Sequence, residues 1–186
     1  CSSSGHSLDM PVYSFRGIVP KIEEGVYVAP SADIIGKVTL SKNVSIWHQC
    51  VARGDVNDIF VGENSNVQDL SMLHVTKDYK LSIGSNVSIG HSVTVHGCTI
   101  GNGCLIGMGA VIMDGAIIGE NSVVAGGSVV PPHKKFPPRS MIMGNPAKVT
   151  RELTEDEVKL YSNHYRAYVN YKEEYLDPEI VKEIKN

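Results

Sequence analysis

The stretch that decides the fold runs from Ile100 to Val130 and reads IGNGCLIGMGAVIMDGAIIGENSVVAGGSVV. An aliphatic residue returns at every sixth position, and four residues after each one comes a small or β-branched residue such as Cys104 or Ala110. A helix would need a period near 3.6 residues. The pattern therefore predicts short strands joined by tight corners, with a structural repeat of six residues.

The same period extends back toward the N-terminus but is broken in three places. Compared with the six-residue period, the interval from Ala52 to Val61 is three residues too long and the interval from Leu73 to Ile83 is four too long. The interval from Val95 to Ile100 is one residue too short. We expect the extra residues to form loops at corners. The repeat positions predict the core, and all of them except Ala52 are Ile, Leu or Val: 28, 34, 40, 46, 52, 61, 67, 73, 83, 89, 95, 100, 106, 112, 118, 124 and 130.

Composition limits the class of protein. The chain has 186 residues, 42% of them apolar, and a net charge of -3, so it offers neither the basic surface of a nucleic-acid-binding protein nor a run of roughly 20 apolar residues that would span a membrane. We expect a cytoplasmic protein without nucleic-acid or membrane partners. Residues 1–9 are interpreted as a tag remnant. The remaining cysteines, Cys50, Cys98 and Cys104, lack CxxC spacing and are interpreted as small core residues.

The repeat resembles that of the hexapeptide-repeat proteins. This resemblance implies a left-handed parallel β-helix with three faces, one coil for every three hexapeptides, which we place at residues 10–150. The sequence TEDE at Thr154–Glu157 is a capping box that predicts a helix in residues 151–186, packed on the β-helix through an apolar face. Asp177-Pro178 predicts the start of a second, short helix.

Two histidines stack in this arrangement. Residues at equivalent places three hexapeptides apart lie about 4.8 Å from one another, the spacing of neighbouring strands. His74 directly follows Leu73 and His96 directly follows Val95, so the two imidazoles share one face, one coil apart. Arg53 lies one coil further down the same column.

A third histidine, His91, belongs to the next face, where Asp69 lies beneath it and Gln68 lies beneath Gly90. Within a single chain His91 cannot meet His74 and His96, but it can when a second subunit docks against the first. Three imidazoles with one open position are the arrangement of a catalytic Zn²⁺ site, and Fe²⁺ or Co²⁺ also suit imidazole ligands. The alternative is three unrelated surface histidines.

Three segments resemble the γ-class carbonic anhydrases and their close relatives: VARGD at 51–55, SNVQD at 65–69, and, after His74, IGHxxxxHG at 89–97. The resemblance covers most of residues 11–175. It implies a homotrimer that holds one metal at each subunit interface through His74, His91 and His96.

The same resemblance assigns roles to the neighbouring residues. Arg53 and Asp55 would form an ion pair across the subunit contact. Gln68 would form a hydrogen bond to the water bound to the metal. Asn66 and Asp69 would lie around the site without binding the metal directly. In AYVNY at 167–171, Tyr168 and Asn170 match residues near the metal pocket.

The activity implied is the hydration of CO₂ to bicarbonate. Lys77 occupies the place of the glutamate that shuttles protons in the best-characterised form, the acidic loop is missing, and Val56 follows Asp55 where another glutamate is expected. Two alternatives stay open. One is an acyltransferase or thioesterase on the same fold, because fold alone does not determine function. The other is a non-catalytic trimer that the metal only staples together.

Overall fold

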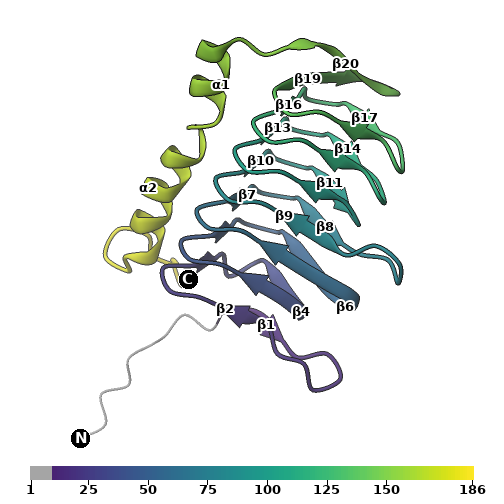
Figure 1. Ribbon diagram of the computed structural model, residues 1–186. Coiled ribbons are helices and arrows are strands. Elements are labelled where there is room, and N and C mark those ends of the chain that lie inside the picture. Colours follow the sequence, from purple (N-terminus) through teal and green to yellow (C-terminus); the bar gives the residue numbers. More distant parts are fainter. Residues whose placement is uncertain (1–9) are drawn as a thin grey trace, which may run out of the picture.

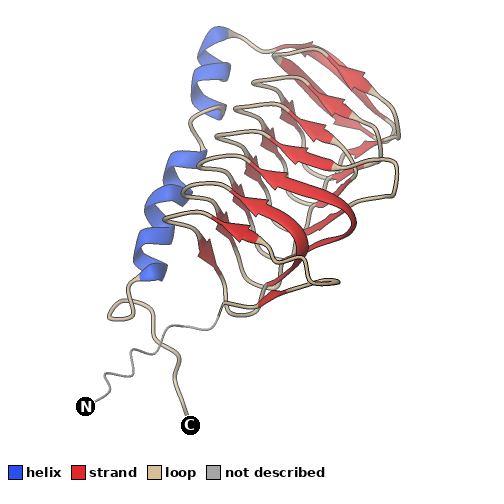
Figure 2. Ribbon diagram, turned by 60° about the horizontal axis from the view of Figure 1, so that its bottom comes forward, coloured by secondary structure: helices blue, strands red, loops and turns tan. Residues whose placement is uncertain are grey.

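The computed structural model describes residues 10–186, so the interpreted tag remnant lies outside the described residues. The chain coils into a parallel β-helix with two helices along one side, which confirms the fold class expected from the repeat (Figure 1). Figure 2 turns the N-terminal end of the coils toward the viewer and shows the helices beside one row of turns.

The first face of the β-helix is an eight-stranded sheet. Its strands are parallel, except that β20 runs antiparallel to β19 and closes the end of the coil. They are β3 (Tyr27–Val28), β5 (Ser45–Ile46), β7 (Asn66–Val67), β10 (Ser88–Ile89), β13 (Leu105–Ile106), β16 (Val123–Val124), β19 (Ser140–Gly144) and β20 (Ala147–Glu152).

The second and third faces form one twelve-stranded sheet, because β4 (Asp33–Leu40) and β6 (Val51–Val61) bend around the corner between them. The second face holds β1 (Val12–Tyr13), β8 (Met72–His74), β11 (Thr94–His96), β14 (Val111–Ile112) and β17 (Val129–Val130). The third face holds β2 (Lys21–Ile22), β9 (Leu81–Ile83), β12 (Thr99–Ile100), β15 (Ile117–Ile118) and β18 (Lys135–Phe136).

All seventeen repeat positions named above are buried, each with 7% or less of its surface exposed, so the predicted core is confirmed. Cys50, Cys98 and Cys104 are buried free thiols, as interpreted from their inward positions. At one row of corners Asn64, Asn86 and Gly103 take positive φ angles of 62°, 59° and 70°. Asparagine and glycine tolerate this left-handed conformation best, which is why they recur there.

The two insertions behave differently. The extra residues before Val61 form no separate loop: β6 continues through them for 11 residues, and the register against β4 shifts between Gly36 and Val38. The extra residues after Leu73 do form a turn, closed by a hydrogen bond from the Thr76 N–H to the Tyr79 carbonyl (3.1 Å).

The C-terminal segment contains α1 (Glu155–Tyr161) and α2 (Tyr165–Leu176). The capping box of Thr154 and Glu157 is present. The helical stretch is interrupted because the Asn163 side chain bonds the Lys159 carbonyl (2.6 Å), the acceptor that its own N–H would use in a continuous helix. The short helix expected at Asp177-Pro178 is wrong: this segment is a single turn around the Asp177 carbonyl.

Helix α2 packs on the first face through aromatic rings. Tyr175 and Tyr168 contact Trp47 with ring centroids 4.8 and 5.5 Å away. Because this face carries Gln68 and Asn66, the helix covers one side of the candidate site.

Candidate metal centre

His74 and His96 stack at the end of the second face, in the predicted register. Nδ1 of His74 lies 3.0 Å from Nε2 of His96, and the two rings are 5.0 Å apart. Both side chains are partly buried, with 17% and 28% of their surface exposed. The strand pairing of β8 and β11 therefore holds the two imidazoles side by side.

Each of these imidazoles gives its other nitrogen to a carboxylate. Nε2 of His74 lies 3.0 Å from Oδ1 of Asp55, and Nδ1 of His96 bonds Oδ1 of Asp114. Burial opposes ionisation of Asp55, but hydrogen bonds from the Val56 N–H, His74 and Arg53 outweigh it and lower the pKa of Asp55 to about 2. Asp55 is therefore an anion at neutral pH.

The donor set fits a cation. A carboxylate only accepts hydrogen bonds, so each neutral ring turns its N–H toward Asp55 or Asp114 and leaves one nitrogen lone pair. These two lone pairs face each other at 3.0 Å, where they repel unless a positive charge lies between them. Two nitrogens bound to one tetrahedral Zn²⁺ ion at 2.0–2.1 Å would be about 3.3 Å apart, close to this separation.

His91 lies at the corner where the first face ends, with Nδ1 3.1 Å from Oδ1 of Asp69. The whole second face separates it from His96 of the same coil. Among residues 10–186, no three His, Cys, Asp or Glu side chains gather as a metal-binding group. Within one chain, His91 and the stacked pair of His74 and His96 therefore lie at opposite edges of one face, which is the placement that the repeat count predicted.

Arg53 and Asp55 form their ion pair within one chain. The sequence placed this pair across a subunit contact. Residues i and i+2 of a strand point to the same side of the sheet, so the two side chains meet without a partner. The Arg53 side chain is 46% exposed and is still available to a neighbouring molecule.

Gln68 and Asn66 are buried under α2 and bond each other. Nε2 of Gln68 donates to Oδ1 of Asn66 (3.0 Å), and Nδ2 of Asn66 donates to Oγ of Ser88 (2.9 Å). Ser88 also contacts Nδ1 of His164 (3.2 Å), in the turn between the helices. Gln68 is the stacking neighbour of Gly90, as predicted, because its N–H bonds the Ile89 carbonyl.

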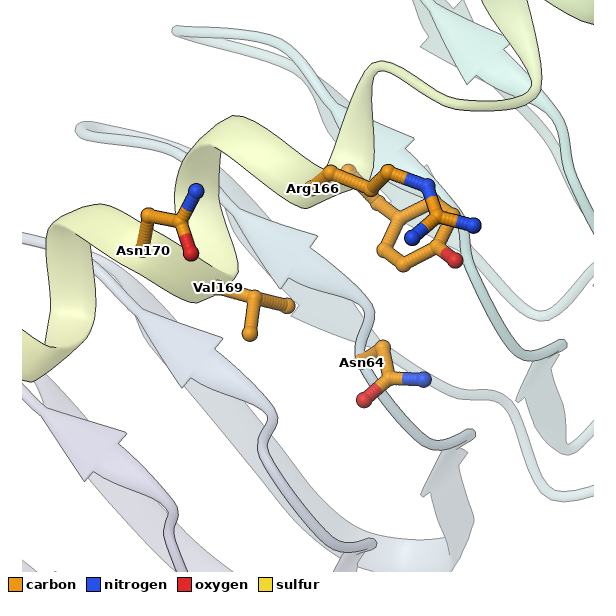
Figure 3. Close-up of a pocket in the computed structure, with 5 residues that line it drawn as sticks. Asn64, Arg166, Val169 and Asn170 are labelled. Atoms are coloured by element: carbon orange, nitrogen blue, oxygen red, sulfur yellow. The ribbon is translucent and has the colours of Figure 1, made fainter.

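Tyr168 and Asn170 lie on different sides of α2. Tyr168 lines a hollow of about 400 Å³ together with Asp69, Trp47 and His48. Asn170 instead lines a hollow of about 310 Å³ with Asn64 and Arg166, at the opposite corner of the first face (Figure 3). Within one chain the structure brings Tyr168 to the His91 side and leaves Asn170 away from it.

The second face, which separates the two parts of the site, is apolar on the outside. Its outward column begins at Asp33 and continues with Val51, Met72, Thr94, Val111 and Val129, none of them fully buried. At the adjacent corner Leu70 and Met108 are 57% and 65% exposed. This face has the character of a subunit contact.

Sequence reasoning missed Asp114, Ser88 and His164. A signal existed for Asp114: it lies one coil from His96, two residues after Ile112, which pairs with Val95. His164 had no such signal, because it lies 76 residues from Ser88 and is placed by helix packing.

These features define a class, the hexapeptide-repeat β-helix proteins. Residues 81–112 and 97–132 match the family model described as bacterial transferase hexapeptide (six repeats). The structure of a hexapeptide transferase family protein from Anaplasma phagocytophilum superposes with a TM-score of 0.84 at 36% identity, covering 88% of this chain and 97% of that one.

Relatives narrow the class. A protein of Methanocaldococcus jannaschii named "Probable carbonic anhydrase" is 42% identical over 152 residues, which cover 82% of this chain and 96% of the relative. The mitochondrial gamma carbonic anhydrase 2 of Arabidopsis thaliana is 41% identical over 157 residues, 81% of this chain, but the match spans only 56% of that protein. The chain belongs to the γ-class carbonic anhydrase family.

Among residues 10–186, neither helix has the length and apolar character needed to cross a membrane.

Proposed function

We propose that this protein hydrates CO₂ to bicarbonate at a metal site built between subunits of a homotrimer. His74 and His96 of one subunit and His91 of the next would hold the ion, with Zn²⁺ the first candidate and Fe²⁺ or Co²⁺ the others. The observation that carries the proposal is the pair of imidazoles 3.0 Å apart, each anchored by a carboxylate.

The position of His91 supports the proposed trimer. His91 and the two stacked histidines lie at opposite edges of the second face, so a head-to-tail contact between copies joins the edges and buries the apolar column between them. A closed ring of three copies would form three equivalent sites.

A divalent metal would supply acidity, because it lowers the pKa of a water molecule it holds to about 7. The residues of the chain do the rest. Asp55 and Asp114 hold the imidazole rings in orientation. Gln68 orients the attacking water through its amide. The oxygen of that water bonds to the carbon of CO₂, one C=O π bond opens, and a proton leaves to solvent, which gives bicarbonate.

The test is stopped-flow CO₂ hydration by protein of known metal content. Gln68→Ala should reduce hydration about 10- to 100-fold and leave metal content and trimer unchanged, because it removes an orienting group and no ligand. Thr99→Ala, on the exposed outer side of the third face, is the matched control and should have no effect. A measurable wild-type rate that Gln68→Ala does not change would refute the role of Gln68.

A second candidate is acyl transfer, because a solved relative at 36% identity is described as a hexapeptide transferase family protein. A pantetheine-binding enzyme needs a groove between prisms and no triad of metal-binding histidines. Metal-loaded protein that does not hydrate CO₂ but binds acetyl-coenzyme A in calorimetry would favour this candidate. Metal-loaded protein inactive in both assays would favour the metal-stapled trimer.

A further inference from the structure

A continuous chain of hydrogen bonds runs from Gln68 to the turn between α1 and α2. Its links are Gln68 to Asn66 (3.0 Å), Asn66 to Ser88 (2.9 Å) and Ser88 to His164 (3.2 Å). Asn66 and Ser88 are 0% and 1% exposed, and Gln68 is 5% exposed. His164 is the exposed end. Bonds shielded from water in this way are strong and constrain their partners.

The chain has a direction. An amide oxygen only accepts and an amide NH₂ only donates, so the orientation of one amide dictates the next. In the structure Gln68 donates to Asn66 and Asn66 donates to Ser88. The Ser88 hydroxyl is then free to donate to Nδ1 of a neutral His164. Gln68 Oε1 has no hydrogen-bond partner among the described residues and is the end left for the site.

A protonated imidazole favours the reverse of every link, because both of its nitrogens donate. Ser88 Oγ can accept from His164 and Asn66 together, but its own shielded hydroxyl then lacks an acceptor in this chain of hydrogen bonds unless it turns to Asn66. Nδ1–H of His164 then donates to Ser88, and the Ser88 hydroxyl turns to the Asn66 oxygen. Asn66 in turn donates to Gln68 Oε1, which leaves the Gln68 NH₂ for the site. The chemical state of an exposed histidine is thereby transmitted to a buried amide.

We propose that His164 is a positioning residue: through Ser88 and Asn66 it sets which end of the Gln68 amide faces the metal site. The proposal rests on the proposed role of Gln68. With the carbonyl oxygen presented, Gln68 accepts a hydrogen bond from the attacking water and leaves its lone pair for CO₂. With the NH₂ presented, Gln68 donates to that lone pair and competes with CO₂.

The surroundings of His164 leave it free to act in this way. Tyr168 of α2 is the titratable side chain stacked beside it, with ring centroids 6.1 Å apart, and Ser88 of β10 is its polar partner. None of the ion pairs formed within residues 10–186 includes His164. The experiment therefore spans the pH range in which histidine side chains in general change charge, about 5 to 8.

The experiment follows the Gln68 side-chain amide by NMR in Zn²⁺-loaded trimer labelled with ¹⁵N at glutamine, from pH 5 to 8. The Gln68 NH₂ signals should shift with the same midpoint as the His164 ring. In Ser88→Ala, the His164 ring signals should still change with pH. The change in the Gln68 NH₂ signals that shares the His164 midpoint should be absent. His164→Phe, which keeps a ring without an acceptor, should abolish it independently if Ser88→Ala fails to fold.

His133→Phe is the matched control, because this exposed histidine contacts Tyr79 at a different corner and should leave the Gln68 shift unchanged. Any direct effect of the metal or of Asp69 on Gln68 persists in Ser88→Ala, so the difference from wild type isolates the chain. A Gln68 amide that does not respond to pH in the wild type, or responds equally in Ser88→Ala, would overturn the proposal.

Activity provides a second readout. At pH 8, His164→Phe should reduce CO₂ hydration toward the level of Gln68→Ala, about 10- to 100-fold, with metal content unchanged. Hydration that is unaffected while the NMR coupling is present would leave the positioning intact and reject the catalytic role of Gln68. The two failures are thus distinguishable.

Discussion

Two carboxylates determine which ring nitrogen of His74 and of His96 carries the proton. Asp55 and Asp114 each take one N–H, so the tautomer of each ring is fixed and the remaining lone pairs converge. Asp114 is the partner that no sequence motif indicated, and it makes the sharper test because Asp55 also bonds Arg53.

Asp114→Ala should lower metal affinity about 10- to 100-fold, because His96 loses the partner that orients it. Competition with a chelator measures the affinity. The absorption spectrum of the Co²⁺-substituted protein should change as well, which a loss of stability elsewhere would not produce. Asp58→Asn, an exposed carboxylate of the same β6 as Asp55, serves as control. An unchanged affinity would remove Asp114 from the site.

The three buried cysteines should be unreactive in the folded protein. Burial raises the pKa of Cys50 to about 11 and those of Cys98 and Cys104 to about 12, so almost no thiolate is present at pH 8. In a Cys1→Ser variant, a thiol reagent should label none of them until denaturant is added, and then all three. Rapid labelling of the native protein would contradict their place in the core.

At the scale of elements, α1 depends on its ends. It has seven residues and none is buried, so packing contributes little. The Thr154 hydroxyl oxygen accepts a hydrogen bond from the Glu157 N–H, and the Glu157 carboxylate accepts one from the Thr154 N–H. The same carboxylate forms an ion pair with Arg151. Helices this short need such caps to form.

The stability of α1 should fall in acid. The Arg151 side chain, followed by the Thr154 N–H, lowers the pKa of Glu157 from 4.5 to about 2. A depressed folded pKa stabilises the helix above about pH 4.5, and this contribution is lost as the pH falls toward about 2. Cα chemical shifts of α1 should therefore move toward coil values over this range. Thr154→Ala should show the coil shift already at pH 6, since losing a cap costs about 1 kcal/mol.

Glu155→Gln is the control for this element, because Glu155 lies in the same first turn without the capping bond. Shifts of α1 that stay helical at pH 2.5 in the wild type would show that the capping bonds do not hold the helix.

At the scale of the whole molecule, the proposed site would couple subunit assembly to metal binding. The coils place His91 at one edge of the second face and His74 and His96 at the other. A single chain therefore cannot bring the three proposed ligands to one metal ion. A ligand that binds only the assembled state stabilises that state by mass action.

His91→Ala should therefore lower both metal content and trimer stability. Chelation should lower the Tm of the wild type and leave the Tm of His91→Ala unchanged. Sedimentation and native mass spectrometry at micromolar concentration measure the assembly. His48→Ala, one coil below Asp69, is the matched control because the proposed ligand set does not include it. A monomer that carries one equivalent of metal would refute the shared site.

The sequence by itself determined the coil, the core and the columns. A six-residue repeat is local, and it dictates which side chain points inward and which positions stack, so His74 over His96 and His91 over Asp69 followed from counting. The placement of Gln68 beside Gly90 followed in the same way.

Only the tertiary structure determined the contacts that the six-residue repeat does not specify. The bond between His164 and Ser88 depends on where a helix docks, and the separation of Tyr168 from Asn170 depends on how that helix is rotated. Counting places Asp114 one coil from His96, but the rotamers that join the two side chains depend on packing at the corner. Repeat counting determines strand register, whereas helix docking and rotamer choice depend on packing between residues far apart in the chain, which no local pattern encodes.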